Sequence, residues 1–410
     1  MFIETTVDIK EYTPNATEFL YNDQLLVDNQ AVELITLVKD AIFLYPERDK
    51  DGIKEILPLG IDDEGNVVGI EGFYLDDDEL VFTNEKPYVI YGYAGIPPEK
   101  TAVFEAGARI HFHDNSGLIA AQSSSVHVLG NPSVDEEQLE GEVIFAGDRL
   151  EPFFEDIPGQ WGTIWLTAGS TNHIFRHATI KNASVGILMD YNDETENPTL
   201  LLEQTQIHNS STVGLWAKTA HVKAVNSIFG NAGNASFYGN IGGSYEFTHC
   251  TFSNYWNRSF RSTPAVILND YVPISQTEDF IVHLEKAVFA NCIIDGNQSV
   301  EFGVEQKGEQ ELSFTLDYTA LRFDPSDDSI FENPYYDFNA LEYYPKLIVN
   351  KNASFHNPTQ NDFRITQESE FLGLGNKDYA ADIPLDLKGA DRTTSPDLGA
   401  LQHVIFEEED

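Results

Sequence analysis

Four residues in the stretch TFSNYWNRSFRS (251–262) have side chains that could act on an acidic polysaccharide. Tyr255 and Trp256 stand a few positions before Arg258 and Arg261. A polysaccharide lyase needs a base that removes the proton beside a uronate carboxyl group, and a cation that neutralises this carboxyl group. Aromatic rings beside two arginines fit these needs, so Arg258 and Arg261 are candidate catalytic residues. The alternative is that both arginines pair with nearby acids and that Trp256 merely covers the fold.

A second candidate site follows from the alternation of side chains along the chain. Trp216 and Lys218 alternate with apolar or small neighbours, as Asp190 does earlier, so all three should point outward from strands. Aligning Gly186 with Gly214 places Asp190 beside Lys218, which predicts a salt bridge between strands rather than an acid/base pair. Trp216 would then be a platform for a sugar ring. A register set by asparagines instead of glycines would shift by one residue and exchange the two faces.

One acidic segment has the start of a calcium-binding loop. Asp49 and Asp51 are followed by Gly52, but Pro58 stands at the twelfth position, where such a loop needs a bidentate Glu. We therefore predict an acidic turn, with Asp49 and Asp51 as candidate ligands for Ca²⁺. No other cofactor is indicated.

The charge of the chain excludes some classes of partner. Among 410 residues, 67 are acidic and 24 are basic, which gives a formal net charge of −43. Such a surface repels phosphate backbones and anionic lipid, so we expect no nucleic-acid partner. No apolar run approaches the ~20 residues that span a bilayer, so we expect no transmembrane segment. The sequence also lacks phosphate-binding loops, nucleophile elbows, zincin motifs and dinucleotide fingerprints.

A repeated phrase indicates which elements position these residues. HATIKN, QTQIHN, SIFGN, CTFSN and CIIDG follow one another between residues 177 and 296. Each has a small residue, a large apolar residue and then usually Asn at every second position, which is the period of a β-strand. Asn182, Asn209, Asn231 and Asn254 lie 22 to 27 residues apart, a spacing typical of solenoids.

Strands repeated in this way predict a parallel β-helix, an all-β fold in which equivalent residues of successive rungs stack ~4.8 Å apart. We expect the Asn side chains to bridge rungs at a corner and to accept its unusual backbone angles. Cys250 and Cys292 share the small position, so they should be neighbours, either as buried free thiols or as a disulfide. The long step between them is interpreted as one rung with a loop at 257–280.

The rungs are expected to begin near residue 86 and to continue to residue 402. Residues 1–85 differ, because alternating strands such as VELITLVKDAIFLY are broken by the acidic turns DKDG and DDEG. That pattern predicts a smaller antiparallel β-domain, or part of a sandwich, before the solenoid. Residues 403–410 are expected to form a short acidic tail.

Several phrases are similar to a known family. NEKPYVIYG, GARIHFHDNSGLI, DIPGQWGTIWLTAGSTNHIF and GGSYEFTHCTFSNYW, all between residues 84 and 256, resemble an uncharacterised family of right-handed β-helix lipoproteins. These lipoproteins are found at the outer membrane of Bacteroidota-type Gram-negative bacteria. NDFRITQES and DLKGADRTTSPDLGALQ, between residues 361 and 402, resemble the closing segment of many bacterial β-helix proteins. The resemblance covers most of residues 84–402 and implies a right-handed parallel β-helix.

Members of that family carry an export signal, a lipid-accepting Cys and an immunoglobulin-like domain before the β-helix. Residues 2–9, FIETTVDI, look like a late strand of that domain. The resemblance therefore implies a chain that is incomplete at its N-terminus, without the signal and the lipidated Cys. It also implies an extracytoplasmic location, at the outer membrane or cell surface of a Gram-negative bacterium. It implies no established activity.

These observations predict a non-catalytic surface protein with a binding or scaffold role, and a glycan is the expected ligand. A long flat face suits an extended polymer, and the candidate ligand-binding residues are Trp216, Tyr255, Trp256, Lys218 and Asp190. One alternative is a polysaccharide lyase that acts on acidic glycans through the two arginines named above. Another is a structural subunit of an outer-membrane assembly, whose partner would be an outer-membrane protein.

Overall fold

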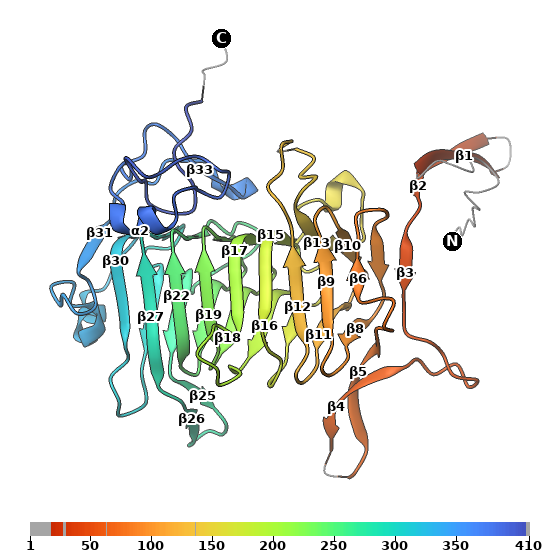
Figure 1. The fold of residues 1–410 in the computed structure, drawn as a ribbon, viewed down its shortest axis with the longest axis horizontal. Helices are drawn as coiled ribbons and strands as arrows, with labels where there is room; N and C mark the ends of the chain where they lie inside the picture. Colours follow the sequence, from red (N-terminus) through yellow and green to blue (C-terminus); the bar gives the residue numbers. More distant parts are fainter. Residues whose placement is uncertain (1–17, 28–29, 63, 136, 407–410) are drawn as a thin grey trace.

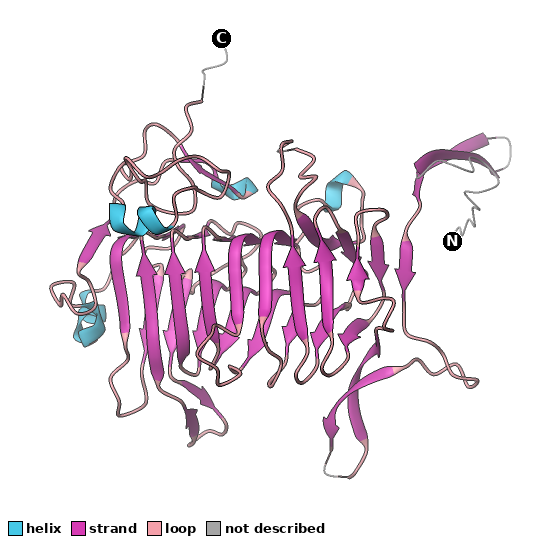
Figure 2. Ribbon diagram, in the orientation of Figure 1, coloured by secondary structure: helices cyan, strands magenta, loops and turns pink. Residues whose placement is uncertain are grey.

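The computed structural model describes residues 18–27, 30–62, 64–135 and 137–406. Its regular structure is almost entirely β, as predicted, and most strands belong to two large sheets (Figure 2). One sheet has 17 strands and the other has 10, and nearly all pairs within them are parallel. The all-β class is therefore confirmed. Residues 2–9, interpreted above as a late strand, lie outside the described part of the chain.

The 17-stranded sheet contains β3 (Ile42–Leu44), β6 (Val81–Phe82), β7 (Tyr88–Ile90), β9 (Thr101–Glu105), β10 (Arg109–Phe112), β12 (Ser125–Leu129), β13 (Val143–Gly147), β15 (His173–Lys181), β17 (Leu200–His208), β19 (His221–Val225), β20 (Ile228–Gly230), β22 (Gly243–Thr248), β23 (Thr251–Asn254), β27 (Leu284–Ala290), β28 (Ile293–Gly296), β30 (Phe314–Leu321) and β31 (Lys346–Val349). The 10-stranded sheet contains β4 (Ile56–Ile61), β5 (Val67–Tyr74), β8 (Tyr93–Ile96), β11 (Gly117–Ala120), β14 (Ile164–Leu166), β16 (Val185–Asp190), β18 (Val213–Lys218), β21 (Ala235–Asn240), β24 (Val266–Asn269) and β29 (Phe302–Glu305).

The chain passes repeatedly from the larger sheet to the smaller sheet and back. Each pass pairs in parallel with the pass before it, so the strands stand side by side along the long axis (Figure 1). In the larger sheet a pass bends once: β17 pairs with β19 near its start and with β20 near its end. The bend falls at a residue with positive φ in six successive passes, namely His177, Gln204, Asn226, His249, Asn291 and Tyr318.

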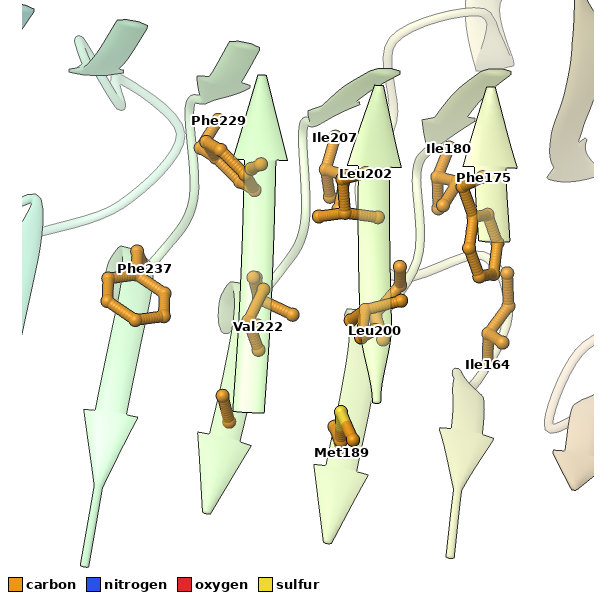
Figure 3. Packing of buried hydrophobic residues seen from close by; sticks show 14 of the residues in the cluster. Ile164, Phe175, Ile180, Met189, Leu200, Leu202, Ile207, Val222, Phe229 and Phe237 are labelled. Carbon is orange, nitrogen blue, oxygen red and sulfur yellow. The ribbon is translucent and has the colours of Figure 1, made fainter. Parts of the chain in front are cut away.

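The large apolar residues of the repeat form the predicted stack in the interior. Ile180 pairs with Ile207, Ile207 with Phe229, and Phe229 with Phe252, and all four side chains are fully buried (Figure 3). The rings of Phe229 and Phe252 are stacked, with centroids 4.8 Å apart. Burying an aliphatic or Phe side chain in this way contributes about 1.5–3 kcal/mol. The stack therefore fixes the register that the repeat predicted.

The small residues of the repeat are also stacked, directly after the bend. The backbone N–H of Thr205 donates to Ser227 Oγ, that of Cys250 to Cys292 Sγ at 3.4 Å, and that of Cys292 to Thr319 Oγ1. A small polar side chain at this position thus accepts a hydrogen bond from the neighbouring pass. Cys250 and Cys292 are neighbours, as predicted, and both are buried free thiols.

The asparagines of the repeat behave differently from the prediction. Asn182 and Asn209 do have positive φ and are hydrogen-bonded to each other, but Asn231 and Asn254 are not among the positive-φ residues. The recurring left-handed residue is instead the one before the small residue, at the bend. Side chains of many types occupy it because the stacked passes on both sides hold the backbone there.

The domain boundaries differ from those predicted. Parallel pairing already begins at β3, and β5 and β6 also pair in parallel, all before residue 86. Among the described residues of that part, β1 (Glu18–Val27) pairs antiparallel with β2 (Gln30–Lys39), β4 pairs antiparallel with β5, and an isolated antiparallel bridge joins Arg48 and Lys54. The stretch 257–280 is not one loop, because β24 returns to the smaller sheet before the hairpin of β25 (Tyr271–Pro273) and β26 (Asp279–Ile281).

Residues 351–406 form a C-terminal lobe rather than further rungs. The lobe contains β32 (Phe355–Asn357), β33 (Asp362–Ile365) and the short helix α2 (Lys377–Asp382). It lies against the outside of the larger sheet near its C-terminal end (Figure 1). The predicted tail is partly packed, since the ring of Phe406 stacks on His356, whereas residues 407–410 lie outside the described part.

Apolar contacts and asparagine amides hold the lobe on the sheet. Ile228 and Ile293 point outward from β20 and β28 and are buried beneath lobe side chains that include Phe363, Phe371 and Leu398. Three amides donate to carbonyl oxygens of the lobe: Asn226 to Leu385, Asn231 to Pro358 and Asn291 to Asn376. Asn231 of the repeat and two asparagines of the bend therefore bind the segment that covers the sheet.

Candidate functional site

A row of apolar and aromatic side chains crosses the outer face of the smaller sheet. The strand register places Trp165, Leu188, Trp216, Tyr238 and Ile267 next to one another in that order, one from each successive pass. All five side chains are half-buried, so one side of each is open to solvent. We call this row the aromatic stripe. Trp216 was predicted to point outward, and the alignment of Gly186 with Gly214 that led to this prediction is correct.

The rings of the aromatic stripe are ordered by their neighbours. Trp216 and Tyr238 are stacked with centroids 5.9 Å apart and planes 15° apart. The Nζ atom of Lys218 lies 4.9 Å from the ring centroid of Trp216, within cation–π distance. The indole N–H of Trp216 donates to Asn240 Oδ1 at 3.3 Å. Rings held in this way lose little side-chain entropy when a ligand stacks on them.

A polar column runs beside the stripe, on the next outward position of the same strands. Asp190 accepts a hydrogen bond from Trp165 Nε1 at 2.6 Å and forms a salt bridge with Lys218 at 3.0 Å. The predicted salt bridge between these strands is thus confirmed. Further along, Asn240 donates to Asn269 Oδ1 at 2.8 Å, and Asn269 donates to the Tyr238 hydroxyl. The arrangement is a flat apolar row edged by amides and one ion pair.

A hollow of about 430 Å³ adjoins the polar column where β16 and β18 end. It is lined by Tyr191, Asn192, Asp193, Glu194 and residues of two neighbouring turns. Hydrogen bonds from three threonines, Thr171, Thr195 and Thr199, lower the pKa of Asp193 although its partial burial opposes them. The hollow therefore carries two carboxylates beside the stripe.

The residues predicted for lyase chemistry do not form a catalytic group. Arg261 is buried and bonded to Glu301, with Nη2 and Oε1 2.7 Å apart and both side chains almost inaccessible. Arg258 is exposed and donates to the backbone oxygen of Asp156. Trp256 is buried, and its Nε1 donates to Ser259. Arg261 thus cannot reach a polymer, and the interpretation in which the aromatic ring covers the fold is correct for Trp256.

Tyr255 lies apart from these arginines, in a cleft of about 290 Å³ beside the C-terminal lobe. Its hydroxyl donates to Asp295 Oδ2 at 2.9 Å. Burial raises the pKa of Asp295, and burial together with the Asp295 charge raises the pKa of Tyr255. Arg322 and Lys351 also line this cleft. A polar ligand could bind there, but Trp216 and the aromatic stripe lie on the other sheet.

Asp49 and Asp51 form the acidic turn that was predicted. One carboxylate oxygen of Asp49 accepts hydrogen bonds from the backbone N–H groups of Asp51 and Ile53, both at 2.9 Å. Within the described residues, no group of three or more His, Cys, Asp or Glu side chains is arranged to hold a metal ion. Binding of Ca²⁺ at this turn stays a prediction.

Trp165, Tyr238 and Asn240 were not identified from the sequence, although a signal was present. Trp165 occurs in the stretch GTIWLT, and Tyr238 and Asn240 occur in ASFYGN, which both alternate like the stretch that contains Trp216. The loops between these stretches differ in length, and the repeat did not show how to align the strands across them.

Comparisons with known proteins do not extend this description. No helix in the described part of the chain is long and apolar enough to cross a membrane. No protein-family model, no curated protein and no solved structure matches this chain.

Proposed function

We propose that this chain is a right-handed parallel β-helix that binds a neutral polysaccharide along the aromatic stripe without cleaving it. The carrying observation is the row of half-buried rings, Trp165, Trp216 and Tyr238, in register across a flat sheet. Parallel passes between two sheets, with a residue of positive φ at the bend of six successive passes of the larger sheet, support the β-helix.

The chemistry of the stripe fits a sugar chain better than another apolar partner. Aromatic faces stack on the apolar faces of sugar rings, while the half-buried Asp190–Lys218 pair offers hydrogen bonds to hydroxyl groups at the edge. Successive passes of a sheet lie ~4.8 Å apart, so Trp165 and Trp216, which are separated by one pass, lie ~9.6 Å apart. An extended polymer can contact both rings.

The charge near the stripe favours a neutral polymer. Asp193 and Glu194 line the adjoining hollow, and Lys218 of the polar column is already paired with Asp190. The whole chain carries a formal net charge of −43, which repels polyanions. The absence of converging cations along the described stripe argues against a lyase that acts on uronates there.

The location is also a proposal. The resemblance of residues 84–402 to outer-membrane lipoproteins supports an extracytoplasmic protein at the surface of a Gram-negative bacterium. A polymer-binding stripe suits that location, because extended glycans are found outside the cell membrane.

Native gels that contain a neutral glucan, a mannan or polygalacturonate test the binding proposal. We expect at least one neutral polymer to retard the protein. Any retardation by polygalacturonate should be the same for the wild type and for the variants of the stripe. Trp216→Ala and Trp165→Ala should each weaken binding about tenfold. Phe260→Ala is the matched control, because Phe260 is an exposed aromatic residue away from the stripe. Equal retardation of the wild type and both Trp variants would overturn the proposal.

The same mixtures test whether the protein is an enzyme. Lyases leave unsaturated ends that absorb ultraviolet light, and hydrolases release reducing ends. Growth of either signal in wild-type mixtures would show catalysis and contradict a role limited to binding. If none of the polymers retards the protein, a protein partner on this face becomes the better hypothesis.

A further inference from the structure

A second cleft lies on the other sheet, between the C-terminal lobe and the outer face of β15, β17 and β20. Its volume is about 590 Å³, within the range of sites that hold small molecules. The floor is formed by outward side chains in register: Thr179 beside Gln206, and Lys181 beside His208. The lobe supplies one wall, and the segment around Glu137 and Asp156 supplies the rim. We call it the lobe cleft.

The lobe cleft brings two lysines together without ion-pair partners. Lys181 rises from the floor and Lys388 from the lobe, and neither forms a salt bridge within the described part of the chain. The third cation, Arg364, is bonded to Asp362. Only 24 residues of this chain are basic against 67 acidic, so two lysines without a salt bridge are unusual in one cleft, which Glu137 and Asp156 also line.

His208 gives the second observation. Its Nδ1 atom is buried and has no hydrogen-bond partner, and the side chain lines the lobe cleft. Burial, and then the charge of Lys181, lower the pKa of His208 to about 3, so the ring is neutral. A buried polar atom without a partner costs about 1–3 kcal/mol, which a ligand atom bonded to it would offset. Lys181 and His208 are paired in register on neighbouring strands, so both groups lie in the same part of the floor.

The other polar residues of the lobe cleft suit hydroxyl groups. Gln206 lies on the floor, Gln360 and Asn361 lie in the lobe, and the carboxylates of Asp156 and Glu137 stand at the rim. Amides and carboxylates accept hydrogen bonds from hydroxyl groups, which a bare inorganic anion does not have.

We propose that the lobe cleft binds a sugar acid, with its carboxylate at Lys181 and Lys388 and a polar atom at His208. Hydroxyl groups of the ligand are then bonded by Gln206 and by the rim acids. This site is separate from the aromatic stripe, which belongs to the smaller sheet. The chain would thus bind a neutral polymer on one face and a small acidic saccharide on another.

Calorimetric titration of the full chain with D-galacturonate, D-galactose or sulfate tests this proposal, because galactose differs from galacturonate only in having a hydroxymethyl group in place of the carboxylate. We expect binding of galacturonate, at least tenfold weaker binding of galactose, and at least tenfold weaker binding of sulfate. Lys181→Ala and Lys388→Ala should each weaken galacturonate binding about tenfold. Lys223→Ala is the matched control, because Lys223 is an exposed lysine on β19 of the same sheet.

Three results would overturn the proposal: no galacturonate binding, equal binding of galactose, or an unchanged affinity of Lys181→Ala. Sulfate that binds as tightly as galacturonate would indicate a general anion site and would also overturn it. Trp216→Ala should leave galacturonate binding unchanged. The proposal therefore stands or falls independently of the polysaccharide on the aromatic stripe.

Discussion

Arg392 of the C-terminal lobe is hydrogen-bonded to His249 of the larger sheet, and both side chains are inaccessible to solvent. Arg392 also donates to the carbonyl oxygens of Gly399 and Ala400, so it ties the lobe together and ties it to the sheet. No carboxylate of the described residues forms a salt bridge with this guanidinium, and burial lowers its pKa to about 10. The contact joins residues 143 positions apart in the sequence.

Replacing Arg392 should release the lobe. Arg392→Met removes three hydrogen bonds, including the one to the Gly399 carbonyl oxygen, whereas the Ala400 oxygen still accepts from the Leu387 N–H; we expect a cost of about 2–4 kcal/mol. Urea unfolding followed by circular dichroism measures the loss. A destabilisation below 0.5 kcal/mol, of the order expected for a surface substitution, would contradict this role. Arg149→Met is the control, because Arg149 is exposed.

The stability of the fold should decrease as the pH falls below about 6.5. Burial lowers the pKa of His173 to about 3, and burial followed by the charge of Arg392 lowers that of His249 to about 2. Because the unfolded imidazole has a pKa of about 6.5, each ring takes up a proton on unfolding between these values, which favours the unfolded chain. The free energy of unfolding should fall by up to about 1.4 kcal/mol per pH unit for each ring.

His173→Gln isolates one of these protons. The slope of the unfolding free energy against pH between pH 6 and 5 should correspond to about one proton fewer in the variant than in the wild type. The carboxylates contribute equally to both slopes, so they do not affect this difference. An unchanged slope in the variant would show that His173 is not buried in its neutral form.

The buried pair of Arg261 and Glu301 should behave as a structural pair. Burial raises the pKa of Glu301 more than Arg261 lowers it, so the attraction does not fully offset the loss of solvent. Arg261→Met should therefore destabilise the fold by about 3–5 kcal/mol, because it leaves a buried carboxylate alone. The double variant Arg261→Met, Glu301→Met should recover most of this loss. Denaturant unfolding of the two singles and the double gives the coupling, and additive losses would argue against a buried pair.

Cys250 and Cys292 should be unreactive in the folded chain. Both are buried, and burial raises the pKa of the Cys292 thiol, which disfavours the reactive thiolate. We expect no reaction with a disulfide reagent under native conditions and two thiols per chain in denaturant. Fewer than two thiols after unfolding without reductant would indicate a disulfide and contradict the structure.

The repeat predicted what depends on local alternation. Ile180, Ile207 and Phe229 stack because a period of two and the repeated order of small, large apolar and Asn residues are enough to define their register. The salt bridge between Asp190 and Lys218 was predictable for the same reason. Both features depend on neighbouring passes of the chain and on little else.

Contacts between distant segments were not predictable. Nothing near Arg261 in the sequence marks Glu301 as its partner, so a buried ion pair was interpreted as a candidate cation for catalysis. The lobe has no repeat, and its alternating segments look like further rungs. His208 resembles any polar residue on a strand until the lobe covers it. The lobe cleft is therefore visible only in three dimensions.

The most direct test of the central claim is a tryptophan fluorescence titration with the neutral polymer that retards the protein. Of the four tryptophans, Trp161 and Trp256 are buried, whereas Trp165 and Trp216 lie on the aromatic stripe. We predict a saturable change in emission that shrinks in Trp216→Phe and in Trp165→Phe, with binding retained because a ring remains. A full-sized change in both variants, or saturable binding with no change in the wild type, would place the polymer elsewhere and contradict the account.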